Sequence, residues 1–558
     1  MNSQQRIHPA AIAIAIVGLV HAGCAGEPDE ARVEPALQTI TAQELADHVQ
    51  TLASDEFRGR LPGTVGEEKT LDYLVGHAED IGLQPGNGDS WFQEVPLVAI
   101  TADPDMTFSV GDGGTVNQYG YGDDFMAWTT RVVDQTELEG SELVFVGFGI
   151  VAPEYDWDDY EGIDVTGKTV VILVNDPGYY TEDPELFNGR AMTYYGRWTY
   201  KYEEAARQGA AGAMIIHETA PAAYGWSTVE GSWAGPQFHM VPEDNNMSRV
   251  KVEGWFQYDV ANEIFEMAGE DMQALSRQAL SRDFEAVPLG LDASVTVRNT
   301  IQRSTSNNVF GLLPGSERPD EYVIYMGHWD HLGADLGLEG DSIYNGALDN
   351  ATGTAGILEL AEAFVSLDAN PERSMVFWWT TAEEQGLLGA AYYAANPIYP
   401  LDQTVAAVNI DGLNIYGPMR DIFVVGYGNS ELDEYLIAAA EEQDRVVKPD
   451  PEPEKGYFYR SDHFPLAKQG VPALYTDTGN EHVEHGEQWT RDKKDEWIAN
   501  HYHQVSDEYS ADWDLRGAVD DLQLFFMIGY ELANEQTYPE WREGTEFKAK
   551  REAMMGTE

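Results

Sequence analysis

Four strand-like segments between residues 322 and 413 end in residues that can bind metal or move protons. These residues are His328 with Asp330, then Asp349, the adjacent acids Glu383 and Glu384, and Asp411. Apolar segments of this length predict buried strands. Polar residues at the carboxyl ends of parallel strands meet at one edge of a sheet, where open α/β sheets have their active sites. We therefore expect these side chains to form one site.

Asp349 lies at a tight turn rich in small residues, and the distant His503 extends the set. Asp349 could approach two cations closely there, although an aspartate that only caps the following helix is an equal alternative. Glu383 and Glu384 follow an apolar strand, where two carboxylates are costly to bury without cations or a proton. One can bind metal while the other acts as general base, as a hydrolase with two metal ions requires.

The order of these residues resembles that of the di-zinc exopeptidases of peptidase family M28. This family includes leucyl aminopeptidases, glutamate carboxypeptidases and, more distantly, glutaminyl cyclases. The flanking segments 382–389, 461–465 and 470–472 are similar as well, and the resemblance covers roughly residues 40–100 and 300–535. It implies an α/β zinc exopeptidase fold, with a doubly wound, mixed but mostly parallel sheet flanked by helices.

The resemblance also implies a role for each residue of the site. Asp349 bridges two zinc ions, although manganese or cobalt would suit the same ligands. The other roles are His328 and Asp411 as ligands of one ion, Glu384 and His503 as ligands of the other, Glu383 as general base, Asp330 as the residue that orients His328, and Tyr502 as a group that stabilises the oxyanion. His331 is a rival ligand to His328. The peptide bond after Asp349 is expected to be cis.

These roles imply a zinc-dependent exopeptidase that hydrolyses peptides through a metal-bridging water, with Glu383 as general base. An aminopeptidase is favoured, because a carboxypeptidase needs cations for the terminal carboxylate of its substrate and basic residues are scarce near the motifs. Arg460 keeps a carboxypeptidase or dipeptidase open, and Arg373, Arg420 and Lys455 are the other candidate cations. The alternatives from other classes are a glutaminyl cyclase-like acyltransferase, which normally uses one zinc, and a non-catalytic binding protein.

A second domain is expected to interrupt the peptidase domain. The segments around Lys168 and Ala213 resemble the β-rich protease-associated (PA) domain; an extension of the catalytic sheet is the alternative. The predicted organisation is a signal peptide (1–23), an acidic tether (24–38), the N-terminal part of the peptidase domain (39–134), the PA-like inserted domain (135–295), the catalytic peptidase domain (296–535) and a C-terminal tail (536–558) packed on the outside. Thr41 and Glu44 predict a capping box at the first helix of the peptidase domain.

The N-terminal residues indicate export. A short apolar segment, residues 10–20, follows Arg6 and His8, as in a signal peptide. The residues up to Cys24 resemble a bacterial lipobox, although His21 replaces the usual aliphatic residue. We therefore expect a periplasmic or cell-envelope lipoprotein anchored through Cys24, in the outer rather than the inner membrane, with plain secretion as the alternative.

The composition limits the partners of the chain. Its 558 residues include 96 acidic and 33 basic ones, and the formal net charge is −63. This charge excludes nucleic acid and anionic membrane surfaces as general partners. Peptides are the expected substrates, and the lipid on Cys24 is the expected contact with a membrane.

Overall fold

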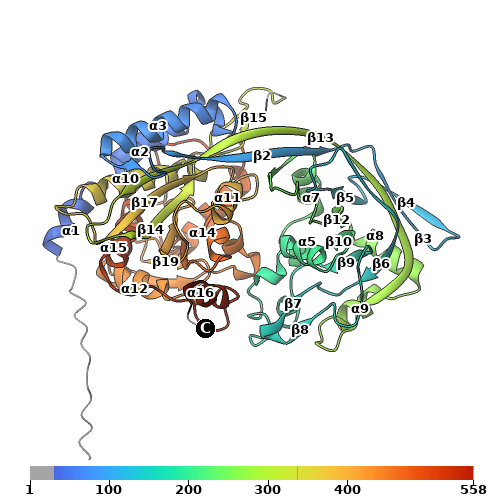
Figure 1. The fold of residues 1–558 in the computed structure, drawn as a ribbon. Coiled ribbons are helices and arrows are strands. Elements are labelled where there is room, and N and C mark those ends of the chain that lie inside the picture. Colours follow the sequence, from blue (N-terminus) through green and yellow to red (C-terminus); the bar gives the residue numbers. More distant parts are fainter. Residues whose placement is uncertain (1–29, 336, 557–558) are drawn as a thin grey trace, which may run out of the picture.

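The computed structural model describes residues 30–335 and 337–556, so the predicted signal peptide and Cys24 lie outside the described residues. Two lobes are joined by β2 (Phe92–Ala102) and by the long strand β13 (Val287–Leu313) (Figure 1). One half of β13 pairs with β2 and β17 (Arg373–Thr380), and the other half pairs with strands of the second lobe. Within the described ranges, every helix is too short or too polar to cross a membrane.

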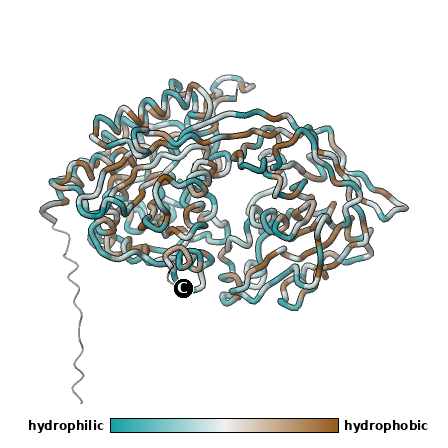
Figure 2. The backbone as a smooth tube through the Cα atoms, viewed as in Figure 1, coloured by the Kyte–Doolittle hydropathy of each residue, from teal (hydrophilic) through white to brown (hydrophobic). Residues whose placement is uncertain are grey.

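The sheet of the first lobe has a parallel centre. β14 (Arg318–His328) pairs in parallel with β17 on one side and with β18 (Thr404–Asn409) on the other, and β18 pairs in parallel with β21 (Ala473–Thr478). β13 joins antiparallel beside β17. All residues of β17 and β18 are buried, as in strands covered on both faces, and apolar segments run through the inside of this lobe (Figure 2). The predicted mixed, mostly parallel sheet is confirmed.

Helices cover both faces of this sheet. One face packs against α2, α3, α10, α12 and α15, and the other packs against α11 and α13. Their bounds are α2 Ala42–Leu52, α3 Val65–Ile81, α10 Thr352–Val365, α11 Leu388–Ala395, α12 Leu432–Glu442, α13 His463–Ala467 and α15 Arg516–Asn534. The other elements of this lobe are α1 Glu30–Leu37, β1 Gln84–Pro85, β11 Pro236–Met240, β15 Gly333–Ala334, β16 Ile343–Tyr344, β19 Asp421–Val424, β20 Val446–Pro449, α14 Glu487–Asn500 and α16 Lys548–Met555.

The N-terminus of α2 only partly follows the prediction. Thr41 Oγ1 accepts a hydrogen bond from the backbone N–H of Glu44 at 3.1 Å, so Thr41 caps the helix as expected. The predicted capping box is wrong in its second hydrogen bond, which would join the backbone N–H of Thr41 to the side chain of Glu44. The backbone N–H of Thr41 donates to Glu359 Oε2 of α10 at 3.2 Å instead of to Glu44, because α10 packs against α2.

The second lobe is built around four parallel strands, β6, β9, β10 and β12. Its elements are β3 Thr107–Gly111, β4 Val116–Gly120, β5 Phe125–Trp128, β6 Gln135–Phe145, β7 Val151–Ala152, β8 Trp157–Asp158, β9 Thr169–Leu173, α4 Pro177–Thr181, α5 Trp198–Arg207, β10 Gly212–Ile216, α6 Thr219–Ala222, α7 Trp226–Trp233, β12 Val252–Phe256, α8 Tyr258–Ala268 and α9 Met272–Gln278. Strands β3 and β5, which precede residue 135, pair with β13 and β12. They therefore join this lobe, whose relation to PA domains stays a prediction.

The C-terminal tail does not simply lie on the outside. Trp541 is 2% exposed, and its Nε1 donates to the carbonyl oxygen of Gly470 at 2.8 Å. Glu546 accepts hydrogen bonds from the backbone N–H of Tyr194 in the second lobe and from the hydroxyl of Tyr459 in the first. The expectation of an external tail was wrong for Trp541, because burial of this large apolar ring outweighs the charge of the segment around it.

Candidate metal centre

Loops at the carboxyl ends of the parallel strands carry most of the predicted site residues. His328 is the last residue of β14, Asp411 lies just beyond β18, and Glu383 and Glu384 lie just beyond β17. The expected strand before Asp349 is limited to β16, and Asp349 itself lies in the turn that leads into α10. The sheet therefore gathers these five side chains at one edge, as expected for an open α/β sheet.

The Asp349 carboxylate lies between two histidines. Its Oδ1 is 3.3 Å from His328 Nε2, and its Oδ2 is 3.2 Å from His503 Nε2. Asp411 Oδ1 is 3.3 Å from His328 Nε2, whereas Glu384 Oε2 is 3.1 Å from His503 Nε2. Two sets, each of one histidine and one acid, therefore share Asp349. We call them the His328 set and the His503 set.

His331 lies next to the His503 set. It is fully buried, and its Nδ1 is 2.5 Å from Glu384 Oε1. His331, Asp349 and Glu384 lie close enough together to hold a metal ion, as do His328, Asp349 and Asp411. His331 thus competes with His503 rather than with His328, the rival expected from the sequence.

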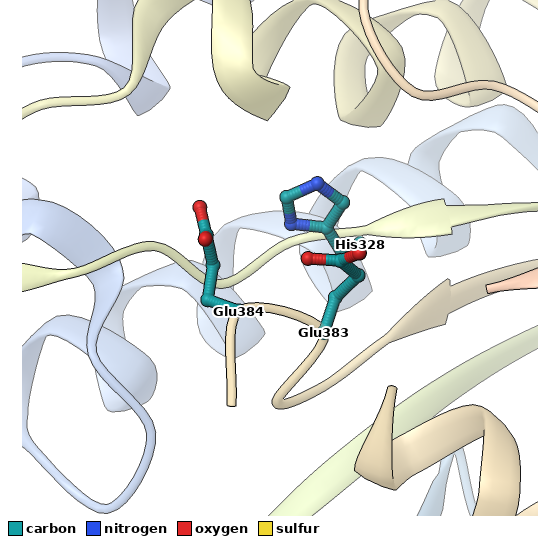
Figure 3. A group of neighbouring side chains, drawn as sticks. All are labelled: His328, Glu383 and Glu384. Carbon is teal, nitrogen blue, oxygen red and sulfur yellow. The ribbon is translucent and has the colours of Figure 1, made fainter. Parts of the chain in front are cut away.

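Glu383 lies beside His328 (Figure 3). The carboxylate of Glu383 lies next to the histidine ring. The side chain of Glu384 starts from the neighbouring backbone position and lies to one side of that ring. Burial raises the pKa of Glu383 well above its usual range; His328 opposes this effect, and the carboxylates of Asp411 and Glu384 add to it. A general base must be ionised, so Glu383 needs further positive charge nearby in order to act as one.

The electrostatics of the site fit divalent cations. Burial disfavours a charged His503, but the carboxylates of Glu384 and Asp349 outweigh it and raise the pKa of His503 to about 11. The pKa of His328 is also raised well above its usual range, against the effect of burial, by neighbours that include Glu383 and Asp349. A site that raises the pKa of both histidines this strongly has an excess of negative charge. Imidazole and carboxylate groups are the ligands that zinc takes in proteins.

Asp330 contacts both His328 and Glu383. Its backbone carbonyl oxygen is 3.1 Å from His328 Nδ1, whereas its carboxylate Oδ1 is 3.9 Å from the same nitrogen. The carboxylate instead accepts the backbone N–H of Glu383 at 3.1 Å. Because the chain turns after His328, the main chain of Asp330 is nearer to the imidazole than the predicted carboxylate.

Tyr502 lies at the exposed side of the site. It is 47% exposed, and its ring stacks on His503 with 4.0 Å between ring centroids. The peptide bond between Asp349 and Asn350 is cis, as the resemblance implied. Both features belong to the loops that bring Asp349 and His503 together.

Sequence reasoning assigned no role to two residues that support the candidate ligands. Ser461 Oγ donates to Asp411 Oδ2 at 2.5 Å, which leaves Oδ1 of that carboxylate facing His328. Arg60 is fully buried and donates to backbone carbonyl oxygens next to the site. Ser461 lies in a segment that resembles the family, which is a weak signal. Arg60 contacts main chain that is distant in sequence, so its role leaves no pattern in the sequence.

Residues 308–527 match the model of Peptidase family M28. This segment is a peptidase family M28 domain. It contains all the candidate metal ligands. Aminopeptidase NAALADL1 of Mus musculus is 35% identical over 129 residues, which are 22% of this chain and 16% of that protein. A probable zinc metalloprotease of Pyrenophora teres f. teres (strain 0-1) is 38% identical over 104 residues, 18% of this chain and 22% of that protein.

The chain thus spans less than a quarter of the length of either relative. Among solved structures, the aminopeptidase from Aneurinibacillus sp. strain AM-1 has a TM-score of 0.49 at 18% identity, over 90% of this chain and 96% of that one. The zinc aminopeptidase BSAP from Bacillus subtilis has a TM-score of 0.40 at 16% identity, over 89% and 96%.

Proposed function

We propose that the M28 domain binds two zinc ions and that the chain is an aminopeptidase, which removes residues from the amino termini of peptides. The observation that carries the proposal is the Asp349 carboxylate, whose two oxygens face separate sets of ligands. His328 and Asp411 would hold one ion, and Glu384 and His503 the other. Manganese or cobalt would suit the same groups.

When bound, zinc would supply a Lewis acid for the scissile carbonyl and would lower the pKa of the attacking water. Glu383 would accept a proton from that water and transfer it to the leaving amine. The backbone N–H of Glu383 is held by Asp330, which keeps its carboxylate beside His328. Tyr502, at the exposed side, would donate a hydrogen bond to the oxygen on which negative charge develops.

Aminopeptidase action is supported by the positions of three of the four candidate cations. Arg373 is fully buried and donates to Glu321 and to two backbone carbonyl oxygens. Lys455 pairs with Glu452 at 2.8 Å, and Arg420 donates to a backbone carbonyl oxygen. These three cations are engaged within the protein, whereas the acidic residues of the site suit the ammonium group of a free amino terminus.

A carboxypeptidase or dipeptidase is the second candidate, and Arg460 favours it. Arg460 precedes Ser461, which contacts Asp411, and its Nε and Nη2 are buried without a hydrogen-bond partner in the described part of the chain. The Nε of Arg197, from the second lobe, is buried in the same state. Burial and then the charge of Arg460 lower the pKa of Arg197 to about 10, so the two guanidinium groups are neighbours. Two neighbouring cations with unused N–H groups favour a carboxylate ligand.

The test is a panel of peptides offered to the zinc-loaded protein. Hydrolysis of peptides with free amino termini, and none of peptides with blocked ones, supports the aminopeptidase. Hydrolysis of amino-blocked peptides that carry a free terminal carboxylate would overturn it in favour of the second candidate. Release of ammonia from N-terminal glutamine would indicate a cyclase, and no turnover of any substrate would indicate a binding protein.

Arg460→Gln separates the two exopeptidases further. If Arg460 binds the carboxylate of the substrate, KM rises for peptides with a free terminal carboxylate and stays the same for their amides.

We also propose that the chain is exported and anchored to the cell envelope through Cys24, as the N-terminal sequence indicates. The net charge of −63 supports peptides rather than nucleic acids as its ligands.

A further inference from the structure

The loop that carries the bridging aspartate lies between two buried groups of opposite charge. This loop, residues 345–349, contacts Arg60 through its carbonyl oxygens and Asp507 through its amides. Arg60 is 0% exposed and Asp507 is 1% exposed. Neither residue belongs to the groups that could hold a metal ion in the described chain. Both charged side chains instead form hydrogen bonds with backbone groups of the loop.

Arg60 holds the carbonyl side of the loop. Its Nη1 donates to the carbonyl oxygen of Asn345 at 2.6 Å and its Nη2 to that of Gly346 at 2.9 Å. Its Nε donates at 2.8 Å to the carbonyl oxygen of Trp329, the residue after His328. A fourth bond reaches Leu52 at 3.0 Å. The planar fork of one guanidinium thus connects two loops that carry candidate ligands.

Asp507 holds the amide side of the same loop. Its Oδ1 accepts the backbone N–H of Leu348 at 3.0 Å, and its Oδ2 accepts that of Asp349 at 3.1 Å. The backbone oxygen of Asp507 accepts a third N–H, from Ala347, at 3.1 Å. Asp507 also lies four residues after His503, so it connects the loop of the bridging residue to the loop of the other histidine.

We propose that Arg60 and Asp507 form a charge clamp, which positions Asp349 so that each of its oxygens faces one ligand set. Hydrogen bonds from backbone amides to a buried carboxylate are strong, and so are those from a buried guanidinium to carbonyl oxygens. The clamp aligns the peptide groups of residues 345–349 between its positive and negative ends. Asp349 needs this support because small shifts of its backbone would move both of its oxygens away from the histidines. The inference rests on the proposed metal centre.

The test is the zinc affinity of the full-length Asp507→Asn protein, measured without substrate by competition with a chelator. Asparagine keeps the shape of the side chain, but it has one acceptor oxygen, and its NH₂ group would face a backbone N–H. Partners of this kind typically contribute 10- to 100-fold to metal affinity. We therefore expect zinc affinity to weaken by about 10- to 100-fold. Asp512→Asn is the matched control, because it removes the same charge five residues away at an exposed position.

A second variant tests the other side of the clamp. Arg60→Lys keeps the charge but replaces the guanidinium fork with one nitrogen, which cannot reach the same carbonyl oxygens. It should also weaken zinc binding at least 10-fold, at temperatures where thermal unfolding shows the protein to be folded. If Asp507→Asn does not fold, Asp507→Glu replaces it, since the longer side chain shifts the carboxylate and should weaken zinc binding to a similar degree.

The outcomes separate this inference from the proposed function. Wild-type protein that binds no zinc would refute the metal centre itself. Wild-type protein that binds zinc, together with folded clamp variants that bind it as tightly as Asp512→Asn does, would refute the clamp alone. A purely structural role would lower the melting temperature of the clamp variants and leave zinc affinity at lower temperature unchanged.

Discussion

His328 and His503 face opposite oxygens of one carboxylate. Their Nε2 atoms lie 3.3 Å from Oδ1 and 3.2 Å from Oδ2 of Asp349. The two histidines are far apart in the sequence: one lies at the end of β14 and the other in the segment between α14 and α15. A single aspartate thus connects two ligand sets, and the predictions below follow from this arrangement.

Glu383→Gln should abolish turnover while leaving metal binding intact. The substitution removes the group that accepts the proton and keeps the size of the side chain, so we expect kcat to fall by at least 10²- to 10⁴-fold. Zinc content should stay at the wild-type value. Glu441→Gln, at an exposed position of α12, is the control. Near-normal kcat in Glu383→Gln would refute Glu383 as the base.

His503→Ala and His331→Ala should differ in metal content. His503 Nε2 faces both Asp349 and Glu384, whereas His331 Nδ1 lies within hydrogen-bond distance of Glu384. We therefore expect His503→Ala to retain one zinc ion per chain and His331→Ala to retain two. The reverse pattern in metal analysis would transfer the ligand role to His331.

Much of the candidate site could be predicted because each residue is linked to a local pattern. His328, Glu383, Glu384 and Asp411 each follow an apolar strand, and parallel strands bring their carboxyl ends together. The mixed sheet followed from the same strands. What separates Asp349 from an ordinary helix cap is its position between two histidines, which only the tertiary structure gives.

Other contacts could not be predicted because they join backbone groups that are distant in sequence. Arg60 and Asp507 bind carbonyl oxygens and amides, which every residue has, so no side-chain pattern indicates them. The same reason applies to Thr41, whose backbone N–H donates to Glu359 instead of to the local Glu44. Each of these polar groups takes the partner that packing places nearest.

Stability should fall as the pH rises through about 8, because of Glu359. Burial, with a smaller contribution from Glu44 and Glu362, raises the pKa of Glu359 to about 8, against the hydrogen bond from Thr41. His48 Nε2 lies 3.9 Å away, and burial lowers the pKa of this histidine to about 4, so it adds little positive charge. The folded state thus holds a proton that the unfolded chain loses near pH 4.5.

The contribution of this proton to the free energy of unfolding is fully present below about pH 4.5 and is lost as the pH approaches 8. Glu359→Gln should flatten this part of the profile and stabilise the protein at pH 8 to 9 by on the order of a few kcal/mol. Denaturant unfolding at several pH values measures it, with Glu441→Gln as control. Equal pH dependence in Glu359→Gln and wild type would contradict the assignment.

Cys24→Ser should release the protein from the cell envelope. If Cys24 carries the lipid, the wild-type protein incorporates labelled palmitate and fractionates with membranes, whereas the serine variant does neither. The chain has no second cysteine that could replace it. Unchanged fractionation and labelling of the variant would leave plain secretion as the explanation of the N-terminal sequence.

The central claim is that Asp349 bridges two metal ions. Its most direct test is calorimetric titration of the metal-free protein with zinc, for the wild type and for Asp349→Asn in parallel. The account predicts two equivalents of zinc per wild-type chain and weakened binding of both in Asp349→Asn, because the two ligand sets share this one carboxylate. A single equivalent in the wild type, or an Asp349→Asn protein that still binds two ions with wild-type affinity, would contradict it.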